Sequence, residues 1–262
     1  MILSIYQVDA FTNHVFGGNP AAVCPLDEWL DDAVMQAIAA ENNLAETAFF
    51  VRRGDRYALR WMTPKVEVDL CGHATLAAAF VIFKYLEPER QSVFFDTTSG
   101  ELVVRRDRDL LRLDFPARPP ERCEPMRELS EALGAEPAEL WATRDYMAVF
   151  ASEDEVCALQ PDMRRVAKLD RFAVIVTAPG KEVDFVSRFF APAQGIPEDP
   201  VTGSAHCTLI PYWSRRLSKT KLNARQVSER GGELFCEDAG TRVFIAGRAV
   251  LFMEGRIHLK PV

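Results

Sequence analysis

Residues 69–75 read DLCGHAT and residues 199–206 read DPVTGSAH, and each stretch opens a long, mostly apolar segment. In both, an Asp is followed by a Gly, a polar residue and an Ala, which are Gly72-His73-Ala74 in the first stretch and Gly203-Ser204-Ala205 in the second. A glycine at the start of an apolar helix is not unusual on its own. Two such openings in one chain indicate an internal duplication.

The segments upstream of the two openings repeat as well. Residues 60–64 read RWMTP and residues 188–192 read RFFAP, and Gly72 and Gly203 follow these segments by eight and eleven positions, respectively. A strand, a loop that holds an Asp and a helix therefore recur once per half, with a short insertion in the second copy. The proline-rich segment 116–125 is the expected boundary, so the halves are 1–116 and 117–262. The final strands of the second half can pair back with the first.

The hydrophobic pattern predicts a mixed α+β chain. Residues 72–85 are apolar nearly all round, which is typical of a buried helix, and Pro211 is expected to kink the helix that begins at Gly203. The expected helices are 31–43, 72–85, 126–133 and 203–217. The expected strands are 2–10, 21–24, 46–51, 57–62, 92–96, 101–105, 111–115, 146–150, 172–177, 184–190, 243–252 and 257–259.

Composition excludes several functional classes. The chain has 262 residues, of which 48% are hydrophobic and 26% charged, and this describes a globular protein with a substantial core. Its net charge of −7 and its lack of a basic, aromatic-rich segment argue against nucleic-acid binding. The longest uncharged apolar run, 74–83, is too short to span a bilayer, and no signal sequence is recognisable at the N-terminus. The six cysteines include no CxxC pair, so reduced thiols and a cytoplasmic location are expected.

The two glycine openings predict a site for an anion. The first turn of a helix has backbone N–H groups without partners in the helix and carries the positive end of the helix dipole, and glycine lets a ligand approach closely. Two such turns are suited to hold a small carboxylic acid in an otherwise negative protein. The alternative is that Gly72 and Gly203 only allow tight helix packing, with Asp69 and Asp199 as ordinary helix caps.

Glu46 is a candidate proton-transfer residue. It follows a helix and enters the nearly apolar run Thr47–Val51. A carboxylate in such surroundings is expected to be partly desolvated, and this suits it to accept and return a proton near neutral pH. Most glutamates at strand starts are solvated, so this position alone does not assign a function.

These segments together resemble the phenazine-biosynthesis PhzF family. The matching segments occur in the family's order and cover nearly the whole chain. They are Gln7–Thr12 (QVDAFT), Phe16–Val23 (FGGNPAAV), Asn43–Phe49 (NLAETAF), Leu70–Thr75 (LCGHAT), Glu198–Ala205 (EDPVTGSA) and Gln226–Gly232 (QVSERGG).

The resemblance implies a fold like that of diaminopimelate epimerase. In that fold two pseudo-symmetric halves each form a mixed sheet, curled into an open barrel around one central helix, with the active site between the halves. A homodimer is also implied. PhzF itself isomerises a dihydro-hydroxyanthranilic acid to a ketone tautomer without a metal or organic cofactor. We therefore expect a cofactor-independent isomerase, without a metal, that acts on a small amino or hydroxy carboxylic acid.

The resemblance also implies roles for particular residues. Glu46 is expected to be the proton shuttle, with His73 and Asp199 as further catalytic residues. Ser204 is expected to complete the polar site, and the backbone at Gly72 and Gly203 to hold the substrate's acid group. Because the helix dipole disfavours an imidazolium at a helix start, His73 is expected to be neutral.

Three alternatives remain open on the sequence. Racemases and epimerases of this fold use two cysteines as base and acid. Cys71 lies near the first such position, or Asp69 does if the count starts from the helix-opening glycine, and Pro200 stands at the second. A two-thiol mechanism is therefore not expected, but a racemase that pairs Cys71 with Glu46 stays open. Cys71 can also be inert packing beneath the helix. A metal-dependent hydrolase is a further alternative, with ligands drawn from Cys71, His73, Asp199, His206 and Cys207. A protein that only binds a small acid is the third.

Overall fold

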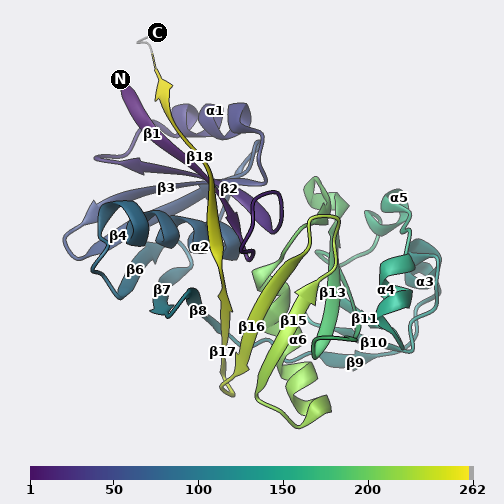
Figure 1. Ribbon diagram of the computed structural model, residues 1–262. Coiled ribbons are helices and arrows are strands. Elements are labelled where there is room, and N and C mark those ends of the chain that lie inside the picture. The colour runs from purple at the N-terminus through teal and green to yellow at the C-terminus, as the bar shows by residue number, and fades with distance from the viewer. Residues whose placement is uncertain (260–262) are drawn as a thin grey trace. The chain divides into compact units, whose positions relative to one another are not determined.

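Figure 1 shows the computed structural model, which describes residues 1–259. The chain forms two compact units. Unit 1 comprises residues 1–114 and the segment from Ala246 onward, and unit 2 comprises Phe115–Ile245. The proline-rich segment 116–125 thus begins unit 2, and the last strand of the chain returns to unit 1. Among the described residues, no helix combines the length and apolar character needed to cross a membrane.

Unit 1 is a mixed sheet with two helices. Its strands pair in the order β18–β1–β2–β3–β4–β6–β7–β8, and the pairs β2–β3 and β4–β6 are parallel whereas the others are antiparallel. Short strand β5 pairs with β4. The strands are β1 (Ile2–Ala10), β2 (Asn19–Leu26), β3 (Glu46–Arg53), β4 (Arg56–Met62), β5 (Glu67–Val68), β6 (Ser92–Thr97), β7 (Gly100–Asp107), β8 (Leu110–Pro116) and β18 (Ala249–His258); the helices are α1 (Asp32–Asn42) and α2 (Gly72–Val81).

Unit 2 repeats this arrangement. Its strands pair in the order β9–β10–β11–β12–β13–β15–β16, with the parallel pairs β11–β12 and β13–β15 and with short strand β14 on β13. The strands are β9 (Glu121–Cys123), β10 (Glu139–Ala142), β11 (Tyr146–Val149), β12 (Val174–Pro179), β13 (Phe185–Ala191), β14 (Ile196–Asp199), β15 (Lys221–Gln226), β16 (Gly232–Asp238) and β17 (Arg242–Gly247), which crosses the division after Ile245; the helices are α3 (Arg127–Leu133), α4 (Glu153–Ala158), α5 (Met163–Val166) and α6 (Gly203–Leu217).

The match between the units extends to individual side chains. On β4, Arg60 donates two hydrogen bonds to the Glu67 carboxylate of β5. On β13, Arg188 donates two hydrogen bonds to Glu198 of β14 in the same way. Arg60 pairs with Phe49 across the sheet, and Arg188 pairs with Val176. The internal repeat read from the sequence is therefore present in the pairing of the strands and in these two ion pairs. The predicted fold class, mixed α+β with two similar halves, is confirmed.

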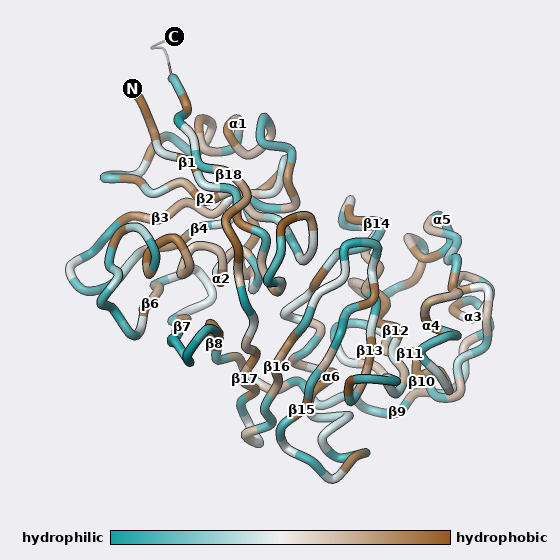
Figure 2. The backbone as a smooth tube through the Cα atoms, viewed as in Figure 1, coloured by the Kyte–Doolittle hydropathy of each residue, from teal (hydrophilic) through white to brown (hydrophobic). Residues whose placement is uncertain are grey.

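Each unit has one buried central helix. In α2 every residue from Gly72 to Ala79 is buried, and the helix packs on β1, β2 and β3. Figure 2 colours α2 and β3 as predominantly hydrophobic. Central helix α6 of unit 2 is buried from Gly203 to Ser214 apart from the partly exposed Ser204, and it contains Pro211. Because α2 is apolar nearly all round, burial against the sheet is the arrangement that removes most of its apolar area from water.

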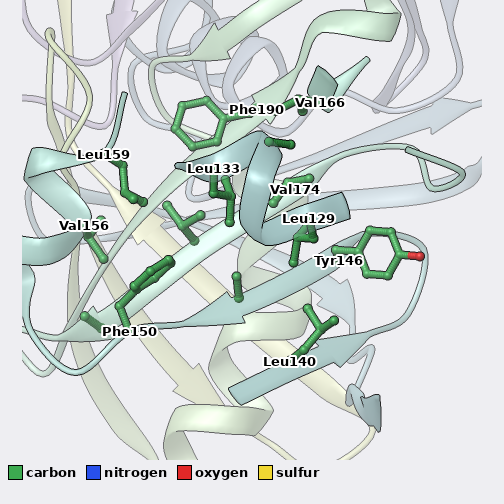
Figure 3. Close-up of a cluster of buried hydrophobic side chains, with 14 of the residues drawn as sticks. Leu129, Leu133, Leu140, Tyr146, Phe150, Val156, Leu159, Val166, Val174 and Phe190 are labelled. Atoms are coloured by element: carbon green, nitrogen blue, oxygen red, sulfur yellow. The ribbon is translucent and has the colours of Figure 1, made fainter. Parts of the chain in front are cut away.

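Unit 2 has a second apolar cluster on the other side of its sheet strands, where α3 and α4 pack (Figure 3). Leu129 and Leu133 lie one turn apart on α3 and are fully buried, and Val174 of β12 and Phe190 of β13 belong to the same cluster. The side chains labelled in Figure 3 are Leu129, Leu133, Leu140, Tyr146, Phe150, Val156, Leu159, Val166, Val174 and Phe190.

The structure corrects the predicted elements in several places: it adds β5, β9, β10, β14, α4 and α5, it ends α2 at Val81, and it makes the strand expected over 257–259 part of β18. The single strand expected over 243–252 is two strands, β17 and β18, separated at Arg248. The Arg248 carbonyl accepts hydrogen bonds from the backbone N–H groups of Phe11 and Thr12, so it is engaged by the loop that follows β1. The sequence analysis also did not predict β15 and β16. On β15 the buried face carries Leu222, Ala224 and the polar Gln226, which gives only a weak apolar alternation.

Candidate functional site

In unit 1 the first turn of α2 lies beside the starts of two neighbouring strands. Strand β2 begins at Asn19 and strand β3 begins at Glu46, and the two strands run parallel with Ala21 opposite Glu46. Helix α2 packs against both strands. Parallel pairing brings strand starts to the same edge of a sheet, so side chains of Asn19, Glu46 and the α2 opening meet at this edge.

Four of these side chains form one buried cluster. Nε2 of His73 lies 3.1 Å from Oε2 of Glu46, and Nδ1 of His73 lies 3.1 Å from Nδ2 of Asn19. Sγ of Cys71 lies 3.5 Å from Nδ1 of the same histidine. The relative exposure of Glu46, Cys71 and His73 is 8%, 6% and 4%. We call Asn19, Glu46, Cys71 and His73 the α2 cluster.

The sequence did not reveal which side chains lie beside His73. Burial by itself lowers the pKa of the His73 imidazole, but the neighbouring Cys71 sulfur and Glu46 carboxylate raise it well above its ordinary value. The expectation of a neutral His73, which considered only the helix dipole, is therefore wrong. A helix terminus contributes about 0.3–1 kcal/mol, and a carboxylate in direct contact inside the protein outweighs it.

Cys71 is held in its thiol form. Burial raises the pKa of Cys71 to about 11, the negative charge of Glu46 adds to this effect, and His73 acts in the opposite direction. A position at a helix N-terminus normally favours a thiolate, but here desolvation dominates. At neutral pH this thiol is therefore a poor base.

One oxygen of Glu46 is available for proton transfer. Oε2 is buried and has no hydrogen-bond partner among residues 1–259, although Nε2 of His73 lies 3.1 Å from it. A buried carboxylate oxygen without a hydrogen bond is costly, so such an atom is usually associated with function. This oxygen can accept a proton without first breaking an existing hydrogen bond.

In unit 2 the corresponding helix opening is held by a chain of side-chain hydrogen bonds. Gln226 on β15 accepts from the backbone N–H of Thr202 (2.9 Å) and donates to the backbone carbonyl of Asp199 (2.7 Å) and the Thr202 hydroxyl (3.2 Å). The Thr202 hydroxyl in turn donates to Oδ2 of Asp199. All three side chains are buried. The Asp199 carboxylate is thus fixed in place next to Thr202, the residue before α6.

Gly203 and Ser204 form the first turn of α6. Gly203 is buried, whereas Ser204 is partly exposed. Nη2 of Arg144 lies 3.4 Å from Oγ of Ser204, and the same guanidinium donates two hydrogen bonds to the buried Asp145. A cationic group therefore stands next to this helix N-terminus, and this increases its suitability for an anion.

The two helix openings differ at equivalent positions. Cys71 is the residue before α2, and Thr202 is the residue before α6, so the hydroxyl of Thr202 occupies the place of the Cys71 thiol in the second repeat. The sequence analysis placed Pro200 there. Phe49 and Val176 are equivalent because they lie opposite the equivalent residues Arg60 and Arg188. Glu46 precedes Phe49 by three residues, and Ala173 precedes Val176 by three residues. The carboxylate therefore occurs in one repeat only.

The metal-hydrolase alternative loses Asp199, His206 and Cys207 from its five ligands, because these three side chains lie outside the group close enough to share an ion within residues 1–259. Nδ1 of His206 donates to the Thr202 carbonyl at 2.8 Å, and burial lowers the pKa of His206 to about 4. Burial raises the pKa of the Cys207 thiol to about 11. Within residues 1–259, the group of His, Cys, Asp and Glu side chains close enough to share an ion is Glu46, Cys71 and His73.

The sequence analysis missed several polar partners of its candidate residues. Asn19 and Gln226 lie within the motifs FGGNPAAV and QVSERGG that carry the family resemblance, so their presence there was the available signal. Arg144 lies outside every motif. Its contact with Ser204 joins residues 60 positions apart, and no sequence pattern indicated it.

Comparison with known proteins agrees with this architecture. The family described as phenazine biosynthesis-like protein (PhzC-PhzF) matches residues 8–255. An uncharacterized isomerase of Pseudomonas aeruginosa is 54% identical over 259 residues, which cover 99% of this chain and 100% of the relative. The crystal structure of a PhzF-family protein of Enterococcus faecalis has a TM-score of 0.97 at 51% identity, covering 99% of this chain and 100% of the other.

More distant structures share only the fold. A hydroxyproline epimerase of Agrobacterium vitis, crystallised with trans-4-hydroxy-L-proline, has a TM-score of 0.61 at 10% identity and covers 98% of this chain and 92% of its own. The epimerase-like fold expected from the sequence is therefore present. Together with the two-unit architecture and the matched helix openings, the family match and the high identity over the full length show that this chain belongs to the PhzF family of phenazine biosynthesis-like proteins.

Proposed function

We propose that this protein is a cofactor-independent isomerase that moves a proton from one carbon to another within a small amino or hydroxy carboxylic acid, with Glu46 as the proton carrier. The observation that carries the proposal is the buried pair of Glu46 and His73 at the N-terminus of α2, in which Oε2 of Glu46 accepts no hydrogen bond from residues 1–259. Two relatives are named as uncharacterized isomerases, and these names support the same reaction class.

The proposed chemistry needs a group that first accepts and then returns one proton. Glu46 takes the proton from a C–H bond next to an electron-withdrawing group, and the electron pair moves into the substrate's conjugated system. The same carboxyl group then returns the proton to a different carbon, so that substrate and product have the same composition. His73, charged beside Glu46, can donate to negative charge that develops on the substrate.

The acid group of the substrate is proposed to bind at a helix N-terminus. The first-turn N–H groups of α2 and the nearby glycine Gly72 suit a carboxylate in a protein of net charge −7. A catalytic role for Asp199 and substrate-binding roles for Cys71, Gly203 and Ser204 are part of the proposal and rest on the family resemblance. A homodimer and a cytoplasmic location are proposed on the same basis.

The test is proton NMR of the purified protein in D2O with trans-2,3-dihydro-3-hydroxyanthranilate and a panel of small amino and hydroxy acids. Wild type is compared with Glu46→Gln. The control is Glu41→Gln, because Glu41 is an exposed glutamate on α1 of the same unit. Deuterium incorporation or isomerised product that depends on Glu46 but not on Glu41 is the expected result. Product with little deuterium indicates internal transfer of the original proton.

A racemase that uses Cys71 with Glu46 is the second candidate, because the Cys71 sulfur lies within the α2 cluster. Both reactions exchange a carbon-bound proton, so the stereochemistry of the product distinguishes them. Inversion at a single carbon without movement of a double bond indicates the racemase. Activity that survives in Glu46→Gln contradicts both.

A further inference from the structure

The side chains of Glu46, Cys71 and His73 offer three different metal ligands at one point. A carboxylate oxygen, the sulfur and an imidazole nitrogen all lie within 4.8 Å of one another, and all three residues are buried. This mixture of oxygen, sulfur and nitrogen donors is characteristic of zinc sites rather than of magnesium or calcium sites. It differs from an acidic surface cluster, which provides carboxylates alone.

The separations are close to those of tetrahedral coordination. Zinc lies about 2.3 Å from sulfur and about 2.0 Å from imidazole nitrogen or carboxylate oxygen, so tetrahedral ligands are about 3.5 Å apart for sulfur and nitrogen and about 3.3 Å apart for nitrogen and oxygen. In the α2 cluster Sγ of Cys71 is 3.9 Å from Nε2 of His73. Nε2 is 3.1 Å from Oε2 of Glu46. Adjustments of a few tenths of an ångström in side-chain rotamers bring these atoms to ligand distances.

The surroundings of His73 also suit a metal ligand. With Nε2 directed to an ion, Nδ1 faces the Asn19 side-chain amide at 3.1 Å. The oxygen and nitrogen of an Asn amide are interchangeable by rotation, so Asn19 can accept a hydrogen bond from Nδ1–H. Metal-bound histidines usually make such a contact through the second ring nitrogen.

We infer that Glu46, Cys71 and His73 form a reversible site for a zinc-like divalent ion, and that occupancy of this site inhibits the isomerase. The inhibition rests on the proposed function, whereas the binding does not. A bound ion occupies the Glu46 oxygen that otherwise carries the proton. Binding releases two protons to the solvent, one from the Cys71 thiol, which becomes a thiolate, and one from Nε2 of the charged His73, which becomes a neutral ligand. Three protein ligands leave a fourth position for water or for a substrate carboxylate.

Cobalt(II) is the probe for binding, because a cobalt–thiolate bond gives a charge-transfer absorption in the near ultraviolet and four-coordinate cobalt gives intense visible bands. Purified, reduced protein is titrated with Co²⁺ without substrate. We expect one Co²⁺ per chain and full displacement by an equivalent of Zn²⁺, which binds such sites more tightly. The charge-transfer band should be lost in Cys71→Ser.

The matched control is Cys157→Ser. Cys157 is exposed on α4 near Glu153 and Asp154, so it tests whether a surface thiol beside carboxylates collects the ion. This variant should keep the band. Glu46→Gln, which preserves side-chain shape, should weaken binding by more than the ~10–100-fold that loss of an outer-shell partner costs. If circular dichroism shows that Cys71→Ser is unfolded, the affinity of Glu46→Gln for the ion decides whether the site exists.

Several outcomes overturn the inference. They are the absence of a thiolate band in wild type, a band that persists in folded Cys71→Ser, a band that disappears in Cys157→Ser, and unchanged affinity in Glu46→Gln. Failure of the isomerase proposal is a separate result, because the titration needs no turnover. If turnover is found, the rate should fall in proportion to Zn²⁺ occupancy and recover with a chelator. A saturated site with an unchanged rate overturns the inhibitory role.

Discussion

Nε2 of His73 and Oε2 of Glu46 lie 3.1 Å apart at the N-terminus of the central helix of unit 1, and both side chains are buried. The histidine opens a helix and the glutamate begins a strand, so the contact exists only in the folded chain. It contributes to the raised pKa of His73, and Oε2 of Glu46 has no hydrogen bond among the described residues. The predictions below begin with this pair.

Glu46→Gln is expected to reduce proton exchange by about 10²–10⁴-fold, which is the usual contribution of a positioned general base. The amide keeps the size of the side chain but cannot carry the proton. The rate of deuterium incorporation, measured by NMR on the responding compound, checks this. Glu41→Gln should keep the wild-type rate. An equal loss in the two variants would argue against a specific role for Glu46.

Cys71→Ala is expected to slow exchange far less than Glu46→Gln, by about 10-fold or less, because Cys71 remains a thiol at neutral pH and does not act as the base. The comparison uses the same NMR assay, with circular dichroism as a check of folding. If the two variants lose activity equally, Cys71 is a partner in catalysis and the racemase candidate gains support.

The stability that His73 gains from Glu46 should depend on pH with a definite sign. The pKa of His73 is raised in the folded protein above its value of about 6.5 in the unfolded chain. The contribution is therefore fully present below about pH 6.5 and is lost as the pH rises through the folded-state pKa. Urea unfolding of wild type and Glu46→Gln should show their largest difference at the lower pH. A difference that grows with pH contradicts this assignment.

His206 should have the opposite effect. Burial lowers the pKa of His206 to about 4, so the unfolded chain binds a proton below about pH 6.5 that the folded chain does not. Lowering the pH from 7.5 to 5 is expected to cost about 2 kcal/mol of unfolding free energy through this residue. His206→Gln, in which the amide can still donate to the Thr202 carbonyl, should be less sensitive to pH over this interval. Equal slopes for the two proteins would refute the prediction.

Arg188 and Arg60, which occupy equivalent positions in the two units, should contribute differently to the free energy of unfolding. The exposed fractions of the Arg188 and Glu198 side chains are 12% and 24%, and Arg188 also donates to the carbonyls of Val156 and Leu159. The exposed fractions of Arg60 and Glu67 are 22% and 36%. Removing a partly buried arginine leaves its partners unsatisfied, so Arg188→Gln is expected to cost about 2–3 kcal/mol and Arg60→Gln about 1 kcal/mol. Urea denaturation measures both, and the reverse order would contradict the argument.

Most of the fold could be predicted from the sequence because its signals are local. The duplicated openings predicted two similar halves, and apolar residues on every face of 72–85 predicted a buried helix. The start of α6 at Gly203 and its end at Leu217 were also predicted correctly. The break at Arg248 could not be predicted, because it depends on hydrogen bonds from Phe11 and Thr12, which are distant in the sequence.

The candidate residues could be named, but their roles remain proposals. Glu46, His73 and Cys71 were identified from three separate features, and the structure brings them together because β3 and α2 meet at one edge of the sheet. The expected neutral charge of His73 was wrong because the sequence does not indicate which side chain lies beside it. Arg144, the cationic partner of Ser204, was missed for the same reason.

The sequence by itself therefore determined the repeat, the two central helices, the family and the residue types available for chemistry, because hydrophobic periodicity and motif spacing are properties of the chain. Only the tertiary structure decided which of those residues touch. Distance and burial decide three features of the site. Glu46 pairs with His73, Cys71 stays a thiol, and the Asp199 carbonyl accepts a hydrogen bond from Gln226. Electrostatic interactions and desolvation change steeply over a few ångströms, and folding alone sets these distances.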